Sequence, residues 1–219
     1  MKKKTTKISS VKKKMPDPKK IKNVGILTVA GDCPGLNAVI KGLVRNAYSQ
    51  YGWKVTGIED GFDGLLDCRT CKLTTREVAG LQLRGGTILG TSNRGNPLHY
   101  PMKEKGRHIF KDVTGDIVAN IKKLGIDALV AVGGDGTMKI AQALFEKGVP
   151  IVGVPKTIDN DLDVTDVTFG FNSAVTIATD ALDRLHTTAE SHHRLLVLEV
   201  MGRDCGWIAL EAGIAGGAD

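Results

Sequence analysis

The chain has 219 residues, 42% of them apolar and 5% aromatic, which is typical of an α/β protein with one or two domains and a sizeable core. No apolar run is long enough to cross a bilayer, so we expect no membrane association. The net charge of +6 would favour an acidic partner such as nucleic acid if it were spread over the folded surface.

Residues 1–22 are predicted to form a basic, disordered tail that accounts for all of the excess positive charge. They hold ten lysines against one acid, Asp17, and the other residues carry 20 of the 30 basic and 23 of the 24 acidic side chains. We therefore expect no specific nucleic-acid partner, with weak binding of RNA or an acidic surface left open for the tail. The tail lacks the apolar segment of a secretory signal and has lysine where a transit peptide has arginine, so we expect a cytoplasmic protein.

The folded part opens with an apolar strand at 24–29, a glycine turn that includes Ala30 and Gly31, and a helix at 35–49. A turn between a strand and a helix can hold an anion, although such turns are common in α/β proteins. A strand is predicted at 53–58, and 59–111 is predicted to be irregular. Within it, the glycine-rich stretch 84–97 contains Arg94, which either stabilises charge on a phosphoryl group or is an ordinary exposed loop arginine.

The next predicted elements are a helix at 112–124, a strand at 127–132 and a helix at 136–147, with Gly133-Gly134-Asp135-Gly136-Thr137 between strand and helix. Glycines let backbone N–H groups approach phosphate oxygens, and the helix start adds its positive end. A carboxylate in such a cradle would repel phosphate unless a cation lay between them. Asp135 is therefore interpreted as a magnesium residue, and the alternative is a helix N-cap.

A strand at 150–154 leads into Val154-Pro155-Lys156-Thr157-Ile158-Asp159-Asn160-Asp161, which we interpret as a catalytic loop rather than a core strand. Ligands of open α/β sheets bind at such strand ends. A loop carboxylate there can accept the proton of a substrate hydroxyl while a lysine and a metal ion stabilise a transferring phosphoryl group. The alternative is a solvated turn, because Asn and Asp often bond to their own backbone.

The remaining chain is predicted to form a helix at 172–190, a strand at 194–200 and a helix from Trp207. The alternation of strands and helices predicts an α/β fold with a mostly parallel sheet flanked by helices. Four cysteines are present without the spacing of a metal site, because Cys68-x-x-Cys71 is not followed by a second pair. Free thiols are expected.

Taken together, the motifs resemble those of the phosphofructokinase family. Five blocks in chain order carry the resemblance: 31–37 (GDCPGLN), 85–90 (GGTILG), 133–137 (GGDGT), 155–161 (PKTIDND) and 201–206 (MGRDCG). The third block alone also resembles the NAD and lipid kinases, so the choice of family depends on the whole set. The resemblance covers the chain from about Val24 to Asp219.

The resemblance implies transfer of phosphate from ATP, with Mg²⁺, to the 1-hydroxyl of fructose 6-phosphate, in a homo-oligomer whose site is shared between subunits. Asp159 matches the family's general base, Asp135 its magnesium residue and Asp161 an acidic neighbour. Arg194 matches an arginine that reaches the substrate phosphate, often across a subunit boundary. The substrate-binding set implied is Thr157, Ile158, Asp159, Arg194, Met201, Gly202 and Arg203. The implied donor-binding set is Ala30, Gly31, Arg94, Gly95, Gly134, Asp135, Gly136, Thr137 and Lys156.

Two positions bear on the choice of phosphoryl donor, and they favour different donors. Gly136 resembles the ATP-using members, whereas Lys156 resembles the pyrophosphate users. An aspartate at position 136, as pyrophosphate users have, would crowd the α-phosphate of a nucleotide, whereas the lysine charge helps either donor. We therefore favour ATP, with pyrophosphate as the alternative.

Three features depart from the family pattern. Ala30 stands where the family has glycine, and its β-carbon would hinder a positive φ or a close approach to phosphate. Either Asn93 or Arg94 aligns with the family's arginine, and we choose Arg94. Family members also continue beyond Asp219, so we expect a first domain at 23–170 and an incomplete second domain at 171–219. A truncated, noncatalytic or regulatory chain of the same fold is the remaining alternative.

Overall fold

The main sheet of the protein is mostly parallel, as predicted. The computed structural model describes residues 17–92, 95–104, 107–163 and 165–219, and in these ranges the sheet order is β3-β2-β1-β6-β7-β8. The strands are β1 (Asn23–Thr28), β2 (Lys54–Ile58), β3 (Thr70–Leu73), β6 (Ala128–Gly133), β7 (Ile151–Thr157) and β8 (Phe169–Gly170). Each neighbouring pair is parallel except β2 with β3. This confirms the predicted fold class.

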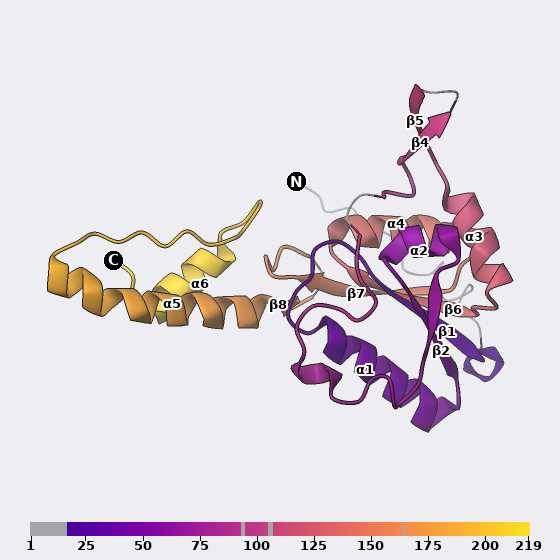
Figure 1. Cartoon of the computed structure of the whole chain (residues 1–219), viewed down its shortest axis with the longest axis horizontal. Helices are drawn as coiled ribbons and strands as arrows, with labels where there is room; N and C mark the ends of the chain where they lie inside the picture. The colour runs from indigo at the N-terminus through magenta and orange to yellow at the C-terminus, as the bar shows by residue number, and fades with distance from the viewer. Residues whose placement is uncertain (1–16, 93–94, 105–106, 164) are drawn as a thin grey trace, which may run out of the picture.

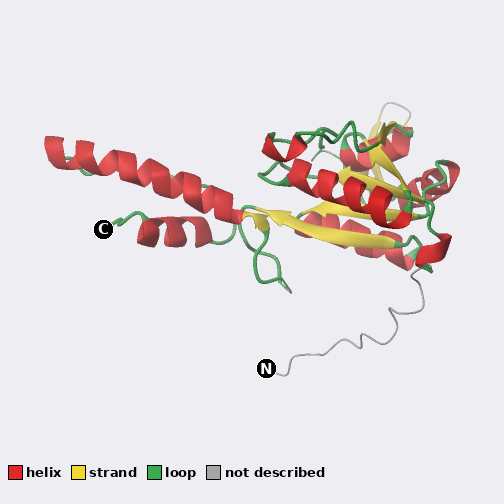
Figure 2. Ribbon diagram, turned by 90° about the horizontal axis from the view of Figure 1, so that it is seen from below, coloured by secondary structure: helices red, strands yellow, loops and turns green. Residues whose placement is uncertain are grey.

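Helices cover both faces of the sheet (Figures 1 and 2). On one face lies α1 (Leu36–Asn46), which continues into a π-helical turn at Ala47–Tyr51. The other face packs against α2 (Gly61–Asp67), α3 (Thr114–Lys123) and α4 (Asp135–Glu146). Because both faces are buried, strands such as β1 and β6 are almost continuously apolar instead of alternating.

Burial of one apolar stripe fixes each of these helices on the sheet. In α1, Leu36, Ile40 and Val44 recur every four residues and are at most 1% exposed. Full burial of each such side chain contributes about 1.5–3 kcal/mol. The π-helical turn that follows α1 ends at Gly52, whose φ of 65° is left-handed and therefore suits glycine.

The prediction that 59–111 is irregular was wrong. This segment forms α2, β3, a 3₁₀ turn at Leu81–Leu83 and an antiparallel hairpin of β4 (Tyr100–Glu104) and β5 (Arg107–Lys111) that projects from the body (Figure 1). The seven-residue α2 contains two glycines, which hides its helical pattern. The hairpin strands carry mostly exposed side chains, so they lack a periodic apolar face.

The C-terminal part consists of α5 (Phe171–His192) and α6 (Trp207–Ala215), which lie against each other and extend away from the sheet (Figures 1 and 2). The predicted strand at 194–200 was wrong, because those residues form no strand. Leu195 and Val197 are 88% and 82% exposed, so this apolar segment has neither a partner strand nor a covering layer in the described part of the chain. None of the helices described is both long and apolar enough to cross a membrane.

Candidate functional site

The polar loops that the sequence singles out leave the sheet at one edge. β1, β6 and β7 are parallel neighbours, with Thr28 paired to Val132 and Gly133 paired to Pro155. The carboxyl ends of the three strands therefore coincide. The turn after β1, the start of α4 at Asp135 and the loop that carries Asp159 all emerge there, which is the edge where α/β sheets bind ligands.

The turn after β1 packs against the glycine-rich segment at 87–92, although the two are far apart in sequence. The Ala30 N–H donates to the Ser92 carbonyl at 3.3 Å, and the Thr91 hydroxyl donates to the Ala30 carbonyl. Ala30 has a φ of 67°, a left-handed conformation that glycine adopts without strain and that an L-residue with a β-carbon rarely adopts. A β-carbon added at the neighbouring Gly31 would meet no atom within 4 Å, so this part of the turn faces open space.

The run at 133–136, which leads into α4, contains three glycines, of which Gly133 is packed and Gly136 is open. A β-carbon at Gly133 would lie 2.2 Å from the Thr137 hydroxyl oxygen, so this close approach requires glycine. A β-carbon at Gly136 would meet nothing within 4 Å. Asp135 is the first residue of α4, and its half-exposed carboxylate pairs with the Lys139 ammonium at 2.5 Å. The carboxylate is therefore accessible at the sheet edge.

Lys156 is not in a loop, which corrects our placement of the end of β7 at residue 154. The strand continues to Thr157, and the Lys156 side chain is only 5% exposed. Its ammonium group donates to the Gly31 carbonyl and so joins β7 to the turn after β1. Burial lowers the pKa of Lys156, and the negative charges of Asp32 and Asp159 nearby oppose that shift.

The Asp159 loop is held by several hydrogen bonds. The Asp159 N–H donates to the Thr157 hydroxyl at 3.1 Å, and the Arg203 N–H donates to the Asp159 carboxylate at 3.4 Å. The Cys205 thiol donates to the main-chain carbonyl of Asp159 at 2.9 Å. The next residue, Asn160, has a φ of 52°, and its side-chain oxygen accepts the N–H of Thr168 at 3.0 Å. Most of these bonds hold the main chain of the loop, and the Arg203 N–H contacts the carboxylate itself.

Two adjoining cavities lie on this side of the molecule. The smaller, of about 460 Å³, is lined by Asp159, Glu199, Val200, Met201, Gly202 and Arg203. It joins the carboxylate to the predicted substrate segment.

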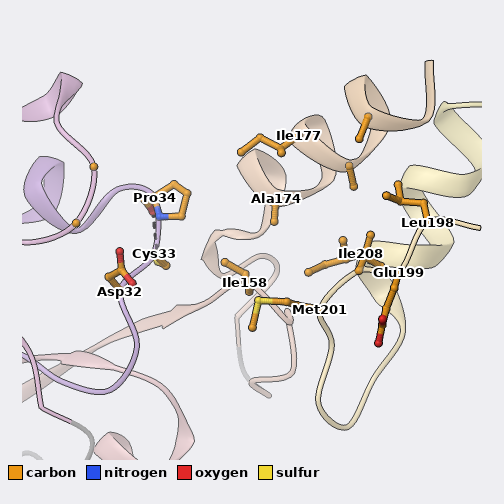
Figure 3. Close-up of a pocket in the computed structure, with 15 residues that line it drawn as sticks. Asp32, Cys33, Pro34, Ile158, Ala174, Ile177, Leu198, Glu199, Met201 and Ile208 are labelled. Atoms are coloured by element: carbon orange, nitrogen blue, oxygen red, sulfur yellow. Dashed lines mark hydrogen bonds between the residues drawn. The ribbon is translucent and has the colours of Figure 1, made fainter. Parts of the chain in front are cut away.

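The larger cavity, of about 580 Å³, lies between the turn at Asp32–Pro34 and α5 (Figure 3). Ala174 and Ile177 of α5 and Ile208 of α6 line it with mostly apolar atoms, so it offers little to a phosphate group. The smaller cavity is therefore the better candidate for the sugar-phosphate site.

Some predicted residues lie away from the loops that emerge at the carboxyl ends of β1, β6 and β7, or are packed against other side chains. Arg194 is just past the far end of α5, where its N–H donates to the Ala189 carbonyl at 2.9 Å. A 22-residue helix is roughly 33 Å long, so within one chain Arg194 is remote from Asp159. Arg94 and Asn93 fall outside the described residues, as does most of the tail. Gly95 is packed, since a β-carbon there would lie 2.1 Å from an Asp63 oxygen.

Sequence reasoning assigned no role to several residues of the site. Cys205 was taken only as a free thiol, and all four cysteines are indeed free. Thr168 and Glu199 were not singled out at all. The sequence offered one indication of a role for Cys205, which is its position two residues after Arg203 in the same block. Only the fold shows that this block contacts the Asp159 loop.

Comparison with known proteins shows the family of the chain. The phosphofructokinase family model matches residues 23–219. The chain is 58% identical to ATP-dependent 6-phosphofructokinase 2 of Clostridium perfringens over 200 residues, 91% of this chain and 55% of that protein. It resembles the T-state structure of Pichia pastoris phosphofructokinase with a TM-score of 0.79 at 35% identity, covering 91% of this chain and 22% of that one.

The chain belongs to the phosphofructokinase family. A pyrophosphate-dependent phosphofructokinase from Marinobacter aquaeolei has a similar structure, with a TM-score of 0.71 and 25% identity over 90% of this chain and 50% of that one. The chain spans about half the length of the Clostridium phosphofructokinase. The match includes every predicted site residue, because only the first 22 residues lie outside it.

Proposed function

We propose that this protein transfers the γ-phosphoryl group of ATP to the 1-hydroxyl of fructose 6-phosphate. The observation that carries the proposal is the position of Asp159: it lines the cavity formed with 199–203, at the edge where the two glycine turns also emerge. The cavity beside this carboxylate, of about 460 Å³, has room for a sugar phosphate. The ATP-dependent relative at 58% identity supports the same assignment.

In the proposed reaction, Asp159 accepts the proton of the 1-hydroxyl as the sugar oxygen bonds to the γ-phosphorus. The bond between that phosphorus and the bridging oxygen breaks, and ADP leaves with the bonding electrons. The contact of the Arg203 N–H with the Asp159 carboxylate orients this base. Met201, Gly202 and Arg203, with Thr157 and Ile158, bind the sugar phosphate in this proposal.

Asp135 fits the proposed magnesium ion. Its carboxylate is half-exposed at the start of α4, beside glycines that can approach phosphate. Proteins usually hold magnesium by one or two carboxylates, and substrate phosphates and water supply the other ligands. When bound, the ion neutralises charge on the polyphosphate.

ATP is the favoured donor because Gly136 leaves open space beside the helix start. Lys156 is weaker evidence for pyrophosphate than its charge alone would imply, because its buried ammonium group already bonds the Gly31 carbonyl. The resemblance assigns Gly31, Gly134, Thr137, Ala30, Gly95 and Arg94 to the same donor set, and of these Gly95 is packed against Asp63. Pyrophosphate is the alternative donor.

The remote position of Arg194 motivates a homo-oligomer as part of the proposal. A residue roughly 33 Å along α5 from the Asp159 end can serve a site only if another subunit provides that site. We further propose that the protein works in the cytoplasm.

An assay of product formation with each donor tests the proposed function. The purified protein is incubated with magnesium, fructose 6-phosphate and either ATP or pyrophosphate, and fructose 1,6-bisphosphate is quantified. We expect product with ATP. Product with pyrophosphate alone would overturn the donor assignment.

A noncatalytic, nucleotide-binding role is the second candidate, because Ala30 places a β-carbon in the donor turn at a positive φ. It predicts binding of ATP with no product from either donor, even at high protein concentration. Isothermal titration alongside the product assay distinguishes the two functions.

A further inference from the structure

The block at 201–206 contacts the loop of the proposed base through a tight turn. Gly202 has a φ of 147°, and a β-carbon there would lie 2.5 Å from the Cys205 carbonyl oxygen. Only glycine therefore lets the chain turn back on itself at this point. The turn brings the N–H of Arg203 and the thiol of Cys205 to the same residue, Asp159.

The two contacts act on different parts of Asp159. The Cys205 thiol bonds the main-chain carbonyl at 2.9 Å, whereas the Arg203 N–H bonds the carboxylate at the longer distance of 3.4 Å. The Arg203 side chain is 80% exposed and its guanidinium pairs with Asp204, so it does not anchor the turn to Asp159. Cys205 is partly buried and is the side chain that joins the turn to the loop.

The other described hydrogen bonds of the Asp159 loop come from within its own segment. Thr157 accepts the Asp159 N–H, and Thr168 donates to the Thr157 carbonyl at 2.7 Å. Thr157 is the last residue of β7, and Thr168 directly precedes β8. Ile158 packs against the apolar cluster of α5 and α6, but without Cys205 the described hydrogen bonds from the 201–206 block to the loop would reduce to the long Arg203 bond.

We propose that Cys205 is a positioning residue for the base: its thiol, bonded to the Asp159 carbonyl, holds the 202–205 turn so that the Arg203 N–H meets the carboxylate. The proposal rests on the proposed role of Asp159 in phosphoryl transfer. It assigns Cys205 no contact with substrate. Its effect on the reaction is therefore on turnover more than on substrate binding.

Two substitutions and one control test this role. Cys205→Ala removes the donor, and Cys205→Ser retains an O–H donor at the same position. Cys68→Ala is the matched control, because Cys68 is also partly buried but follows α2, outside the 157–168 and 201–206 segments. Hydrogen–deuterium exchange of the 158–161 amides measures the anchoring directly and requires no enzymatic activity.

We expect Cys205→Ala to speed exchange at 158–161 by about fivefold and Cys68→Ala to leave it unchanged, since one hydrogen bond contributes about 1 kcal/mol. In the same variant kcat should fall about five- to tenfold with KM for fructose 6-phosphate within about threefold, and Cys205→Ser should recover most of the loss.

Unchanged exchange in Cys205→Ala would overturn the proposal, as would a change in KM alone with normal kcat. Should the wild-type protein form no product, the proposed function fails. The anchoring by Cys205 is then judged by the exchange rates alone, which support it if they rise in Cys205→Ala and not in the control.

Discussion

At the scale of single residues, Ala30 holds a left-handed backbone conformation in the proposed donor turn. Its φ is 67°, and a left-handed L-residue costs roughly 1–2 kcal/mol relative to the right-handed form. Glycine would avoid that strain but would lose more conformational entropy on folding. The two terms oppose each other, and the strain is the larger.

Ala30→Gly should therefore raise the free energy of unfolding by about 0.5–1 kcal/mol. It should also tighten ATP binding, because the turn loses a β-carbon beside the phosphate site. Urea denaturation and isothermal titration measure the two effects. A variant less stable than the wild type would contradict the account of this turn.

Lys156 gives a second prediction, which concerns pH. Burial lowers its pKa from the ordinary value of 10.5, so below 10.5 there is a range in which the unfolded chain holds a proton that the folded chain has lost. Stability contributed by this group must then rise with pH through that range. Cys33 acts in the opposite direction, because burial raises its thiol pKa from 9.0 to about 11 and stability falls as the unfolded thiol ionises.

Lys156→Met tests the lysine contribution. Cys33 is present in both proteins, and loss of the Lys156 charge would raise the pKa of Cys33 further, which changes the difference between the proteins in the same direction. The free energy of unfolding is measured by urea denaturation at intervals from neutral pH to 10.5. The free energy of unfolding of the wild type minus that of the variant should increase as pH rises toward 10.5. A difference that stays flat or decreases over this range would show that burial does not disfavour the Lys156 charge.

At the scale of elements, the start of α4 is expected to select the phosphoryl donor. Gly136 is the second residue of the helix, and a side chain there would enter open space instead of the core. Gly115 occupies the same position in α3 and is equally unobstructed. The pair offers one substitution in two matched helix starts.

Gly136→Asp should weaken ATP binding by about tenfold to a hundredfold, because a carboxylate would face the nucleotide phosphates. Stability should change little, since an acid in the first turn suits the helix dipole. Gly115→Asp should leave ATP binding unchanged. Equal affinity for ATP in both variants, measured by titration, would remove Gly136 from the donor site.

Elements with a strong apolar pattern could be predicted from sequence, and those that depend on distant partners could not. β1, β6, α1 and α4 were located to within a few residues because each buries a continuous or periodic apolar set. The hairpin of β4 and β5 was missed because its side chains are mostly exposed. The strand expected at 194–200 failed for the opposite reason, since its pattern is apolar but no neighbouring strand pairs with it in the described residues.

The site followed the same division. Motifs placed Asp135 and Asp159 after strands, and the parallel pairing of β6 with β7 puts the two at one edge. The bonds from Lys156 to Gly31 and from Cys205 to Asp159 join residues 125 and 46 positions apart, so no local pattern could reveal them.

At the scale of the whole molecule, the α5–α6 part exposes an apolar face. Leu195, Val197 and Ile214 are each at least 75% exposed, and the neighbouring cavity is mostly apolar. Contiguous exposed apolar surface marks an interaction site or an aggregation risk. We therefore expect this chain, expressed by itself, to associate through that face.

Val197→Lys should reduce self-association and the binding of an apolar fluorescent dye. Val167→Lys is the control, because Val167 is 47% exposed on the loop before β8, outside α5, α6 and the 194–200 segment. Sedimentation velocity and dye titration measure the two effects. Equal behaviour of the two variants would show that the face does not drive association.

The most direct test of the central claim is single-turnover phosphoryl transfer in Asp159→Asn, which keeps the shape of the side chain and removes its ability to accept a proton. With enzyme in excess over labelled ATP and with saturating fructose 6-phosphate, the rate of product formation should fall by at least about a hundredfold. Binding of fructose 6-phosphate should change only modestly. A transfer rate equal to that of the wild type would contradict the assignment of Asp159 as the base.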